Sequence, residues 1–450
     1  MVKLTNSFCS IKPFTALVIG DFMLDTYTTG KVRRISPEAP VPIMEVISQE
    51  SRPGGAGNVV LNLATLGGKV FAIGRVGDDG AGVQLQQQLM LADTSGFVVE
   101  PGYQTPVKNR LISDSQQLIR IDFETISPLK SHLEKQVIRQ LELIIPTVQV
   151  IAVSDYGKGF LTPSILTAAT QIARMHNIPL IVDPKGIDFT KYQGATVLKP
   201  NLSEAYAAAK LPTTASLEEV AKVLFDLTDI ELLLITRSEA GISLFDRNGT
   251  RSDFPVRSKE VKDVTGAGDT VLATLCTALA NKLDMATAVQ LANIAAGIAI
   301  ERLGCVQITL SEMARRLVEF DLGTKIFDET HTYALHQVLK DRQYALLVLS
   351  SGQEMNNVLF RTIRELSARE SELVIYFSGS DPSDELIRLL ASLNEVNFII
   401  FQTESLKNLC QAIHPQEIFA LENDQLREIH HGVDLLSRLM MPPPKQRSSL

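Results

Sequence analysis

The sequence has few cysteines, no long apolar run and no excess of basic residues. Its four cysteines are scattered, with neither the paired spacing of a metal site nor the density of a disulfide scaffold, which indicates a reduced, cytoplasmic setting. No apolar run reaches the roughly 18 residues of a membrane helix, and the N-terminus lacks the apolar core of a signal peptide. With 51 acidic against 43 basic residues, the chain is not expected to bind nucleic acid.

The composition is that of an ordinary globular protein of two or three domains, with 45% hydrophobic residues among 450. In the first two-thirds, short apolar runs alternate with helical patterns. The runs span residues 16–19, 150–153, 179–182, 195–198 and 232–235, and the helical patterns span residues 58–66, 133–143, 163–176 and 217–227. This alternation predicts a three-layer α/β domain over residues 1–322, with ligands at the carboxyl ends of parallel strands. Each polar residue at those ends is equally well explained as a cap that terminates its strand.

Two segments depart from this alternation. Residues 28–47 are rich in proline and β-branched residues, and residues 107–123 alternate apolar and polar residues. Both patterns predict short strands of a small accessory sheet. Such a flap would cover a pocket at the edge of the main sheet.

The strongest motif is the run DVTGAGD at residues 263–269. Small residues before a helix let backbone N–H groups approach an anion, and the helix dipole favours negative charge there. Asp269 is placed to take a proton from an attacking hydroxyl, while the amides of Gly266, Ala267 and Gly268 stabilise charge on a transferring phosphoryl group. A glycine-rich turn with an Asp cap is the alternative, and the complete run favours the catalytic interpretation.

A second motif is the run GGAGN at residues 54–58. Gly54 and Gly55 would let a polyol pack against the backbone, and Asn58 can form a hydrogen bond with a sugar hydroxyl. A hinge of the flap explains the same glycines. Neither motif is a P-loop, which needs GxxxxGK[ST], and no GxGxxG run follows a strand, so a dinucleotide site is disfavoured.

Together the two motifs resemble those of the ribokinase-like (PfkB) carbohydrate kinases. The run NLSE at residues 201–204 resembles the NxxE element of that family. Further runs resemble the kinase half of the bacterial bifunctional heptose 7-phosphate kinase and heptose 1-phosphate adenylyltransferase. These are RISPEAPVP at residues 34–42, QQLIRIDFE at 116–124, DPKG at 183–186 and TRSE at 236–239.

This resemblance implies a ribokinase-like domain that uses ATP and Mg²⁺ to phosphorylate D-glycero-β-D-manno-heptose 7-phosphate at O1, for ADP-heptose and lipopolysaccharide core synthesis. It implies that Asp269 is the base and that Asn201 and Glu204 bind Mg²⁺, largely through water. The expected substrate-binding residues are Asp21, Asp25, Gly54, Gly55, Asn58, Lys108, Arg120 and Lys185, and the expected nucleotide-binding residues are Asn201, Glu204, Thr236, Arg237, Gly241 and Asn293. The basic residues suit a sugar phosphate, whose dianion needs cationic partners, although each is equally well explained as a solvated surface base.

After residue 322 the pattern changes. Residues 323–342 predict a linker and then a helix at residues 333–339. Residues 343–440 predict a smaller Rossmann-like α/β domain, and residues 441–450 predict a disordered tail. The expected strands of this domain are residues 345–349, 373–377 and 396–401, and the expected helices are residues 357–368 and 384–393.

The spacing in this domain is similar to the nucleotidyltransferase half of the heptose enzyme, with one departure. Where that family has an HxGH motif after the first strand, this chain has SSGQEMNN at residues 350–357. Because the histidines of the motif bind the ATP phosphates, we expect a degenerate domain without adenylyltransferase activity. An unrelated α/β domain is the alternative.

Two other functions stay open at this level, a kinase for another sugar phosphate and a non-catalytic regulator that binds sugar or nucleotide. The complete base and anion-hole motif and the NLSE run argue against the regulator. The expected partners are therefore a sugar phosphate and ATP, with neither nucleic acid nor membrane. The resemblance also implies a homodimer formed through the flap.

Overall fold

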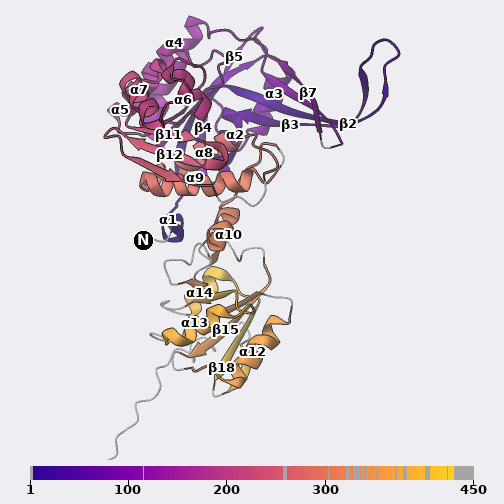
Figure 1. Cartoon of the computed structure of the whole chain (residues 1–450), viewed down its shortest axis with the longest axis vertical. Coiled ribbons are helices and arrows are strands. Elements are labelled where there is room, and N and C mark those ends of the chain that lie inside the picture. The colour runs from indigo at the N-terminus through magenta and orange to yellow at the C-terminus, as the bar shows by residue number, and fades with distance from the viewer. Residues whose placement is uncertain are drawn as a thin grey trace, which may run out of the picture. The chain divides into compact units, whose positions relative to one another are not determined.

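The computed structural model describes residues 4–429 except 115, 257–260, 303, 321–324, 328–334, 337–338, 340–341, 351–352, 370–371, 379–382, 401–405 and 423. The chain divides into two compact units, one of Ile11–Thr309 and one of Leu310–Leu450 together with Met1–Ser10 (Figure 1). Within the described ranges, every helix is too short or too polar to span a bilayer.

The described part of the larger unit is built on a nine-stranded sheet with the order β13-β12-β11-β10-β9-β8-β1-β4-β5. Its strands are β1 (Phe14–Gly20), β4 (Gly68–Gly77), β5 (Val98–Glu100), β8 (Val150–Ser154), β9 (Leu180–Asp183), β10 (Val197–Leu198), β11 (Leu232–Thr236), β12 (Ile242–Asp246) and β13 (Arg251–Phe254). The seven neighbouring strands β11, β10, β9, β8, β1, β4 and β5 of this sheet run parallel, and β12 and β13 add an antiparallel edge. Every residue of β8 is buried, which confirms the predicted parallel strands covered on both faces.

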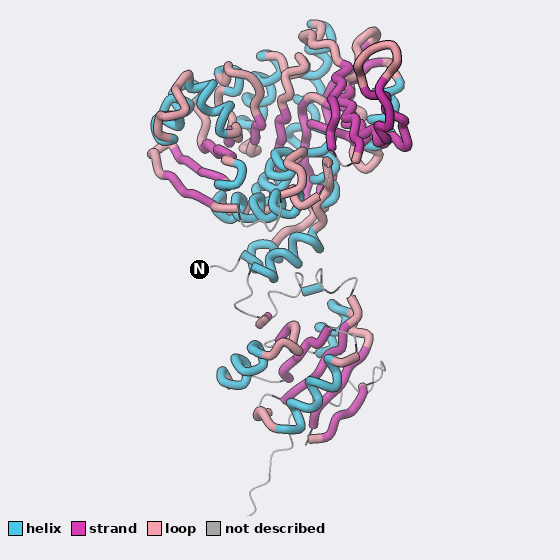
Figure 2. The backbone as a smooth tube through the Cα atoms, turned by 45° about the vertical axis from the view of Figure 1, so that its right-hand side comes forward, coloured by secondary structure: helices cyan, strands magenta, loops and turns pink. Residues whose placement is uncertain are grey.

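Two layers of helices cover this sheet (Figure 2). The helices are α2 (Ala56–Thr65), α3 (Gly80–Gln88), α4 (Ser131–Ile144), α5 (Pro163–Met175), α6 (Leu202–Ala209), α7 (Leu217–Thr228), α8 (Ala267–Ala280) and α9 (Met285–Ala299), with 3-10 turns at Ile145–Thr147, Thr190–Tyr192 and Ser238–Ala240. Along β1, Leu17 and Ile19 face the layer of α4 to α7, whereas Ala16 and Val18 face the layer of α2, α8 and α9. The predicted three-layer α/β fold is therefore confirmed.

The predicted accessory sheet is also present. It consists of β2 (Phe22–Ile35), β3 (Pro42–Gly55), β6 (Val107–Ser113) and β7 (Gln116–Phe123) in the order β3-β2-β6-β7. In Figure 1 its long β2–β3 hairpin projects from the main sheet. The first residues of β2 are buried and the last are exposed, so the base of the flap adjoins the carboxyl end of β1.

The smaller unit contains a six-stranded sheet with the order β14-β17-β16-β15-β18-β19 among its described residues. Its elements are β14 (Ile326–Phe327), β15 (Tyr344–Ser350), β16 (Glu372–Ser378), β17 (Phe398–Ile400), β18 (Glu417–Glu422), β19 (Gln425–Glu428), α10 (Leu310–Phe320), α12 (Asn357–Ser367), α13 (Asp384–Ser392), α14 (Leu406–Ile413) and α1 (Leu4–Cys9). The predicted second α/β pattern is thus confirmed. Its mostly parallel strands carry a hydrophobic core of their own.

Near the junction of the units the structure differs from the expected pattern. Helix α10 belongs to the smaller unit, where it contacts α1, although it lies within the residues 1–322 assigned to the first domain. Strand β14 lies inside the predicted linker. Its residues Ile326 and Phe327 pair with Ile399 and Ile400 of β17. Most of the expected helix at residues 333–339 and the whole tail at residues 441–450 lie outside the described residues.

Candidate active site

Asp269 lies in the first turn of α8 and is buried. Each oxygen of its carboxylate has a donor: the Asn58 amide donates to Oδ2 at 3.0 Å, and the Tyr156 hydroxyl donates to Oδ1 at 2.9 Å. Burial raises the pKa of Asp269 to about 7, although both hydrogen bonds oppose the shift. A carboxylate whose pKa is near neutral is suited to take a proton from an alcohol.

The turn before α8 requires glycine at position 266. Gly266 has a φ of +77°, and a Cβ there would lie 2.7 Å from Nδ2 of Asn58. The Ala267 N–H donates to the Val264 carbonyl at 3.2 Å. The N–H groups of a first helical turn, such as that of Gly268, have no partner inside the helix. Of the expected anion-hole residues, Gly268 therefore presents the amide best suited to an anion.

Asp21 follows β1 and is buried. Its Oδ2 accepts hydrogen bonds from the backbone N–H groups of Tyr156 at 2.9 Å and Lys158 at 3.0 Å. Burial, assisted by the nearby Asp155, raises the pKa of Asp21 to about 6. Asp21 thus holds the loop after β8, while its Oδ1 has no hydrogen-bond donor among the described residues.

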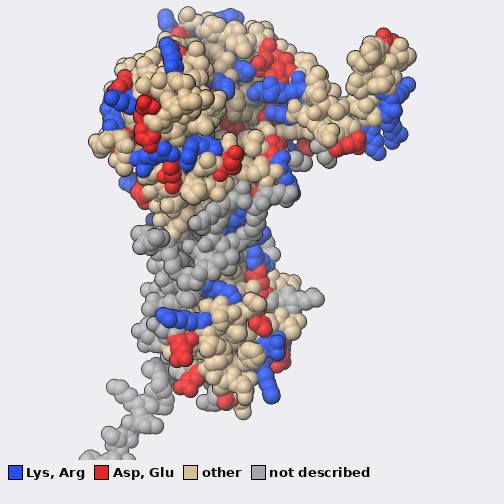
Figure 3. Space-filling view, in the orientation of Figure 1, with Lys and Arg blue, Asp and Glu red and all other residues tan. Residues whose placement is uncertain are grey.

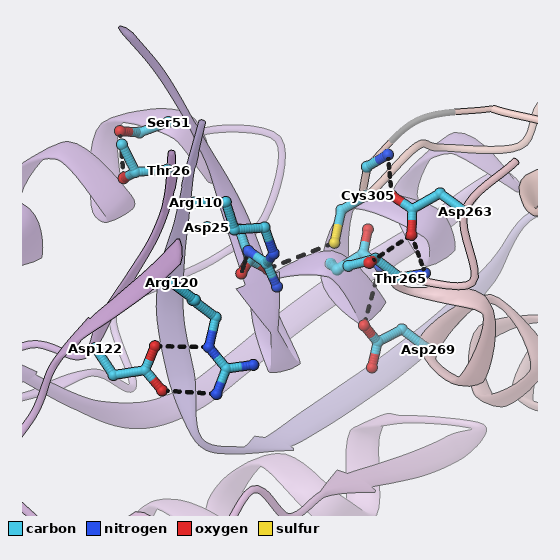
Figure 4. A network of polar contacts seen from close by, with 12 residues as sticks. Asp25, Thr26, Ser51, Arg110, Arg120, Asp122, Asp263, Thr265, Asp269 and Cys305 are labelled. Carbon is cyan, nitrogen blue, oxygen red and sulfur yellow. Dashed lines mark hydrogen bonds and ion pairs between the residues drawn. The ribbon is translucent and has the colours of Figure 1, made fainter. Parts of the chain in front are cut away.

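Asp25 lies on β2 and forms a buried ion pair, with 2.6 Å between its Oδ1 and Nη1 of Arg110 (Figure 4). The Cys305 thiol donates to the other oxygen, Oδ2, at 3.5 Å. A Cβ at Gly54 would come within 2.1 Å of the same oxygen, so a larger residue here would displace the Asp25 carboxylate. The structure therefore brings together two expected substrate residues, Asp25 and Gly54, and adds Arg110 to them.

The expected cations have different surroundings. Figure 4 shows Arg120 on the exposed strand β7 in a bidentate pair with Asp122, at 2.8 and 2.9 Å. The Lys108 ammonium lies 5.1 Å from the centre of the Tyr156 ring, and no carboxylate pairs with it among the described residues. Burial lowers the pKa of Lys108. Lys31, Arg33 and Arg34 lie on the exposed end of β2, and Figure 3 shows basic side chains gathered near the outer end of the flap.

A cavity of about 680 Å³ reaches the N-terminus of α8. Its lining includes Tyr156, Asp183, Lys185, Lys199, Asn201, Glu204, Thr236, Gly241, Ala267, Gly268 and Asn293. Among the expected nucleotide residues, Arg237 does not line this cavity. It instead pairs with Asp253 at 3.1 Å on the antiparallel edge of the sheet. Lys185, expected on the substrate side, lies with the nucleotide residues.

Asn201 and Glu204 have a structural role beside their position in the cavity. The Asn201 side chain accepts a hydrogen bond from the Glu204 N–H at 2.9 Å, and the Glu204 carboxylate accepts one from the Asn201 N–H at 3.1 Å. This capping box starts α6. The Lys185 ammonium donates to the remaining Glu204 oxygen at 2.8 Å. The capping box thus holds an ion pair of Glu204 and Lys185 in the cavity lining.

Three further expected residues, Asn293, Gly241 and Thr236, line the same cavity. Asn293 on α9 donates to the Phe254 carbonyl at 2.8 Å and so ties the helix to β13. Gly241 has a φ of +85°, and a Cβ there would lie 2.0 Å from the same carbonyl oxygen. Thr236, at the end of β11, bridges to Asn201. The backbone conformation at Gly241 is therefore required for β12 to turn beside the cavity.

The structure adds residues that sequence reasoning did not assign. Lys199 and Asp183 form a buried ion pair of 2.9 Å at the cavity wall, and a Cβ at Gly268 would lie 3.6 Å from each. Tyr156 holds Asp269, and Cys305 contacts Asp25. Tyr156, Asp183 and Lys199 all lie at or just beyond the end of an apolar run, which is a signal in the sequence. Nothing in the sequence around Cys305 marks its position.

Within the described ranges, no group of three or more His, Cys, Asp or Glu side chains is arranged to hold a metal ion. The carboxylate and amide oxygens of Asp183, Glu204 and Asn201 nevertheless line one cavity. These are the hard donors that Mg²⁺ prefers, and Mg²⁺ commonly keeps several waters and binds through substrate phosphates. The donor set therefore fits a magnesium ion held mostly through water and phosphate.

Residues 15–312 match the model of the pfkB family carbohydrate kinases. The bifunctional protein HldE of Trichlorobacter lovleyi is 38% identical over 441 residues, covering 93% of this chain and 90% of the relative. The bifunctional protein HldE of Campylobacter jejuni strain RM1221 is 43% identical over 440 residues, covering 94% of this chain and 93% of the relative.

Solved structures show the same fold at low sequence identity. Arabidopsis thaliana ribokinase in complex with ribose and ATP has a TM-score of 0.55 at 16% identity, and covers 68% of this chain and 99% of its own. Escherichia coli phosphofructokinase-2, with substrates and products, has a TM-score of 0.55 at 17% identity, and covers 69% of this chain and 100% of its own. These matches show that the larger unit has the ribokinase-like fold.

Proposed function

The chain belongs to the pfkB family of carbohydrate kinases, and we propose that it transfers the γ-phosphoryl group of ATP to O1 of D-glycero-β-D-manno-heptose 7-phosphate. The observation that carries this proposal is Asp269, a buried carboxylate at a helix N-terminus beside a large cavity. The similarity of this chain to bifunctional HldE proteins over more than nine-tenths of its length supports a heptose substrate. The product is the 1,7-bisphosphate, a precursor for ADP-heptose.

In the proposed reaction, Asp269 takes the proton of the O1 hydroxyl as O1 attacks the γ-phosphorus. The bond from the γ-phosphorus to the bridging oxygen breaks, and ADP leaves with that oxygen. The Gly268 amide and the N-terminal dipole of α8 stabilise the charge on the transferring group. Phosphoryl transfer needs chiefly positioning and charge neutralisation, and these groups supply both.

We place ATP in the 680 Å³ cavity, whose size suits a nucleotide. Lys199 lies at the wall next to Gly268 and is the buried cation nearest to where the phosphates would meet α8. Mg²⁺ would be held by Asn201, Glu204 and Asp183, mostly through water, and would neutralise charge on the ATP phosphates.

We place the sugar between the base of the flap and the carboxyl end of β1, where Asp21 and Asp25 lie. A phosphate on the sugar needs a cation that is not already neutralised. Arg110, Arg120 and Lys185 each have a carboxylate partner, whereas Lys108 has none among the described residues. Lys108 is therefore the cation that we assign to the substrate phosphate.

We expect the smaller domain to lack adenylyltransferase activity, because no histidine follows β15 where the nucleotidyltransferases have the HxGH motif.

We also expect a cytoplasmic homodimer. The flap sheet exposes apolar side chains at Ile47, Ile119 and Phe123, which suits contact with a second copy. Light scattering of the full chain tests this, and a monomer at micromolar concentration would contradict it.

The decisive experiment compares the wild type with Asp269→Asn. ADP release is measured with ATP, Mg²⁺ and the heptose 7-phosphate, and then with fructose 6-phosphate or ribose as controls. We expect turnover with the heptose only, and a loss of kcat of about 10²–10⁴-fold in Asp269→Asn, the range that a general base contributes. Calorimetry should show that the variant still binds the sugar phosphate.

Mass analysis of the same reactions tests the smaller domain. The bisphosphate alone is expected. ADP-heptose appearing after phosphatase treatment would show that the domain retains activity. If the wild type turns over none of the sugars but binds them, the non-catalytic regulator is favoured instead.

A further inference from the structure

Each oxygen of the Asp269 carboxylate already accepts a hydrogen bond from another residue of the protein before any substrate binds. Oδ2 accepts from Asn58 and Oδ1 accepts from Tyr156. A general base needs the acceptor hydroxyl within hydrogen-bond distance of one of its oxygens. One of the two present donors must therefore move or share its oxygen when the sugar arrives.

The two donors differ in how firmly they are held. Asn58 is fully buried, and the Asn62 amide donates to both its side-chain and its backbone oxygen, at 3.1 and 3.0 Å. Tyr156 instead lines the cavity and is only partly buried. It is followed by the exposed Gly157, whose φ is +68°. The Tyr156 phenol is therefore the donor that a ligand can reach and displace.

The position of the Tyr156 ring supports the same conclusion. The Lys108 ammonium lies 5.1 Å from its centre, and a Cβ at Gly55 would lie 3.3 Å from its Cδ2. The ring thus lies between the expected phosphate cation, the glycine motif of the sugar side and the nucleotide cavity. A hydroxyl group in this position is next to the place where sugar and nucleotide must meet.

We propose that in the free protein the Tyr156 hydroxyl occupies the place at Asp269 that the acceptor hydroxyl of the sugar takes during the reaction. This inference rests on the proposed function. Tyr156 is then a positioning residue: it satisfies a buried carboxylate oxygen while the site is empty and gives it up on substrate binding. It neither gains nor loses a proton in the phosphoryl transfer.

The test is the pH dependence of Tyr156→Phe, which keeps the ring and removes the hydroxyl. Because the phenol hydrogen bond lowers the pKa of Asp269, its loss should raise that pKa in the free enzyme. The acid limb of kcat/KM reports the free enzyme and should move up by roughly half to one pH unit. The acid limb of kcat reports the substrate complex, from which the phenol has already withdrawn, and should stay in place.

Other groups facing Asp269 are unchanged in this variant, namely Asp183, Lys199, Asn58 and Cys305. The matched control is Tyr344→Phe. It removes a buried phenol of the smaller unit that donates to the Ile413 carbonyl. Neither acid limb should move in this control. A shift there would mean that loss of any buried phenol disturbs the site.

Two results would overturn the inference. If both limbs move equally in Tyr156→Phe, the phenol stays on Asp269 in the complex. If neither moves, the phenol does not hold the base.

A carbon-13 titration of Asp side chains in the free protein, with Asp269 assigned through Asp269→Asn, needs no substrate. If the wild type fails to phosphorylate the heptose 7-phosphate, the proposed function fails. An Asp269 titration unchanged in Tyr156→Phe would then overturn the inference independently.

Discussion

Replacing Asp269 by Asn should stabilise the protein at alkaline pH while it removes the proposed general base. Asn has the shape of a protonated Asp and can keep both neighbours, Asn58 and Tyr156. In the folded chain the pKa of Asp269 is raised from an ordinary 3.8 to about 7 by burial. Between these values the folded state holds a proton that the unfolded chain releases. The wild type therefore loses stability as the pH rises through this window, and the Asn variant does not.

The size of the effect follows from the same shift. Each pH unit inside the window is worth about 1.4 kcal/mol. From about pH 5 to about pH 8 the titration crosses roughly two units of the window, so the wild type should lose up to about 3 kcal/mol relative to Asp269→Asn. Asp21, whose pKa is raised to about 6, titrates in both proteins and cancels from the difference.

The measurement is urea unfolding of both proteins, followed by far-ultraviolet circular dichroism across this pH range. Asp284→Asn is the matched control. Asp284 caps α9 and its pKa is lowered by hydrogen bonds to the Thr287 backbone and hydroxyl, so it stays ionised throughout. The control difference should not change with pH. A stability difference between wild type and Asp269→Asn that is constant from acid to alkaline pH would refute the buried, proton-binding carboxylate.

Two further pairs of substitutions, each a variant with its control, test the turn before α8 and the cation that we assign to the substrate phosphate. Gly266→Ala and Gly249→Ala place a Cβ at similar positive φ, +77° and +82°, but only the first meets a neighbour. Both should lose about 1–2 kcal/mol of stability in urea unfolding, and Gly266→Ala alone should lose kcat about tenfold or more because it displaces Asn58; equal kcat would contradict this. Lys108→Met should raise KM for the sugar phosphate about tenfold or more with little change in kcat, whereas Arg120→Met, which removes an exposed paired base, should change KM much less.

The elements of the larger unit were predictable because their signals are local. The runs at residues 150–153 and 232–235 are apolar enough to need cover on both faces, which implies parallel strands and two helical layers. The alternation at residues 107–123 marks the flap equally well. Strand β14 was missed because two residues carry no periodicity. Only the edge of β17, distant in sequence, gives Ile326 and Phe327 a partner.

The DVTGAGD and GGAGN runs predicted, without any coordinates, a base beside an anion hole, and they indicated the family to which the chain belongs. Small residues, a helix start and an acid at fixed spacing are properties of neighbouring residues, so a sequence can display them. The tertiary structure alone decided that Asn58 and Tyr156 hold the two oxygens of Asp269. It also decided that Arg110 and Cys305 share Asp25. These contacts join segments up to 280 residues apart, and burial there raises the pKa of Asp269. No local pattern encodes such distances, because they depend on how the sheet, the flap and α8 pack together.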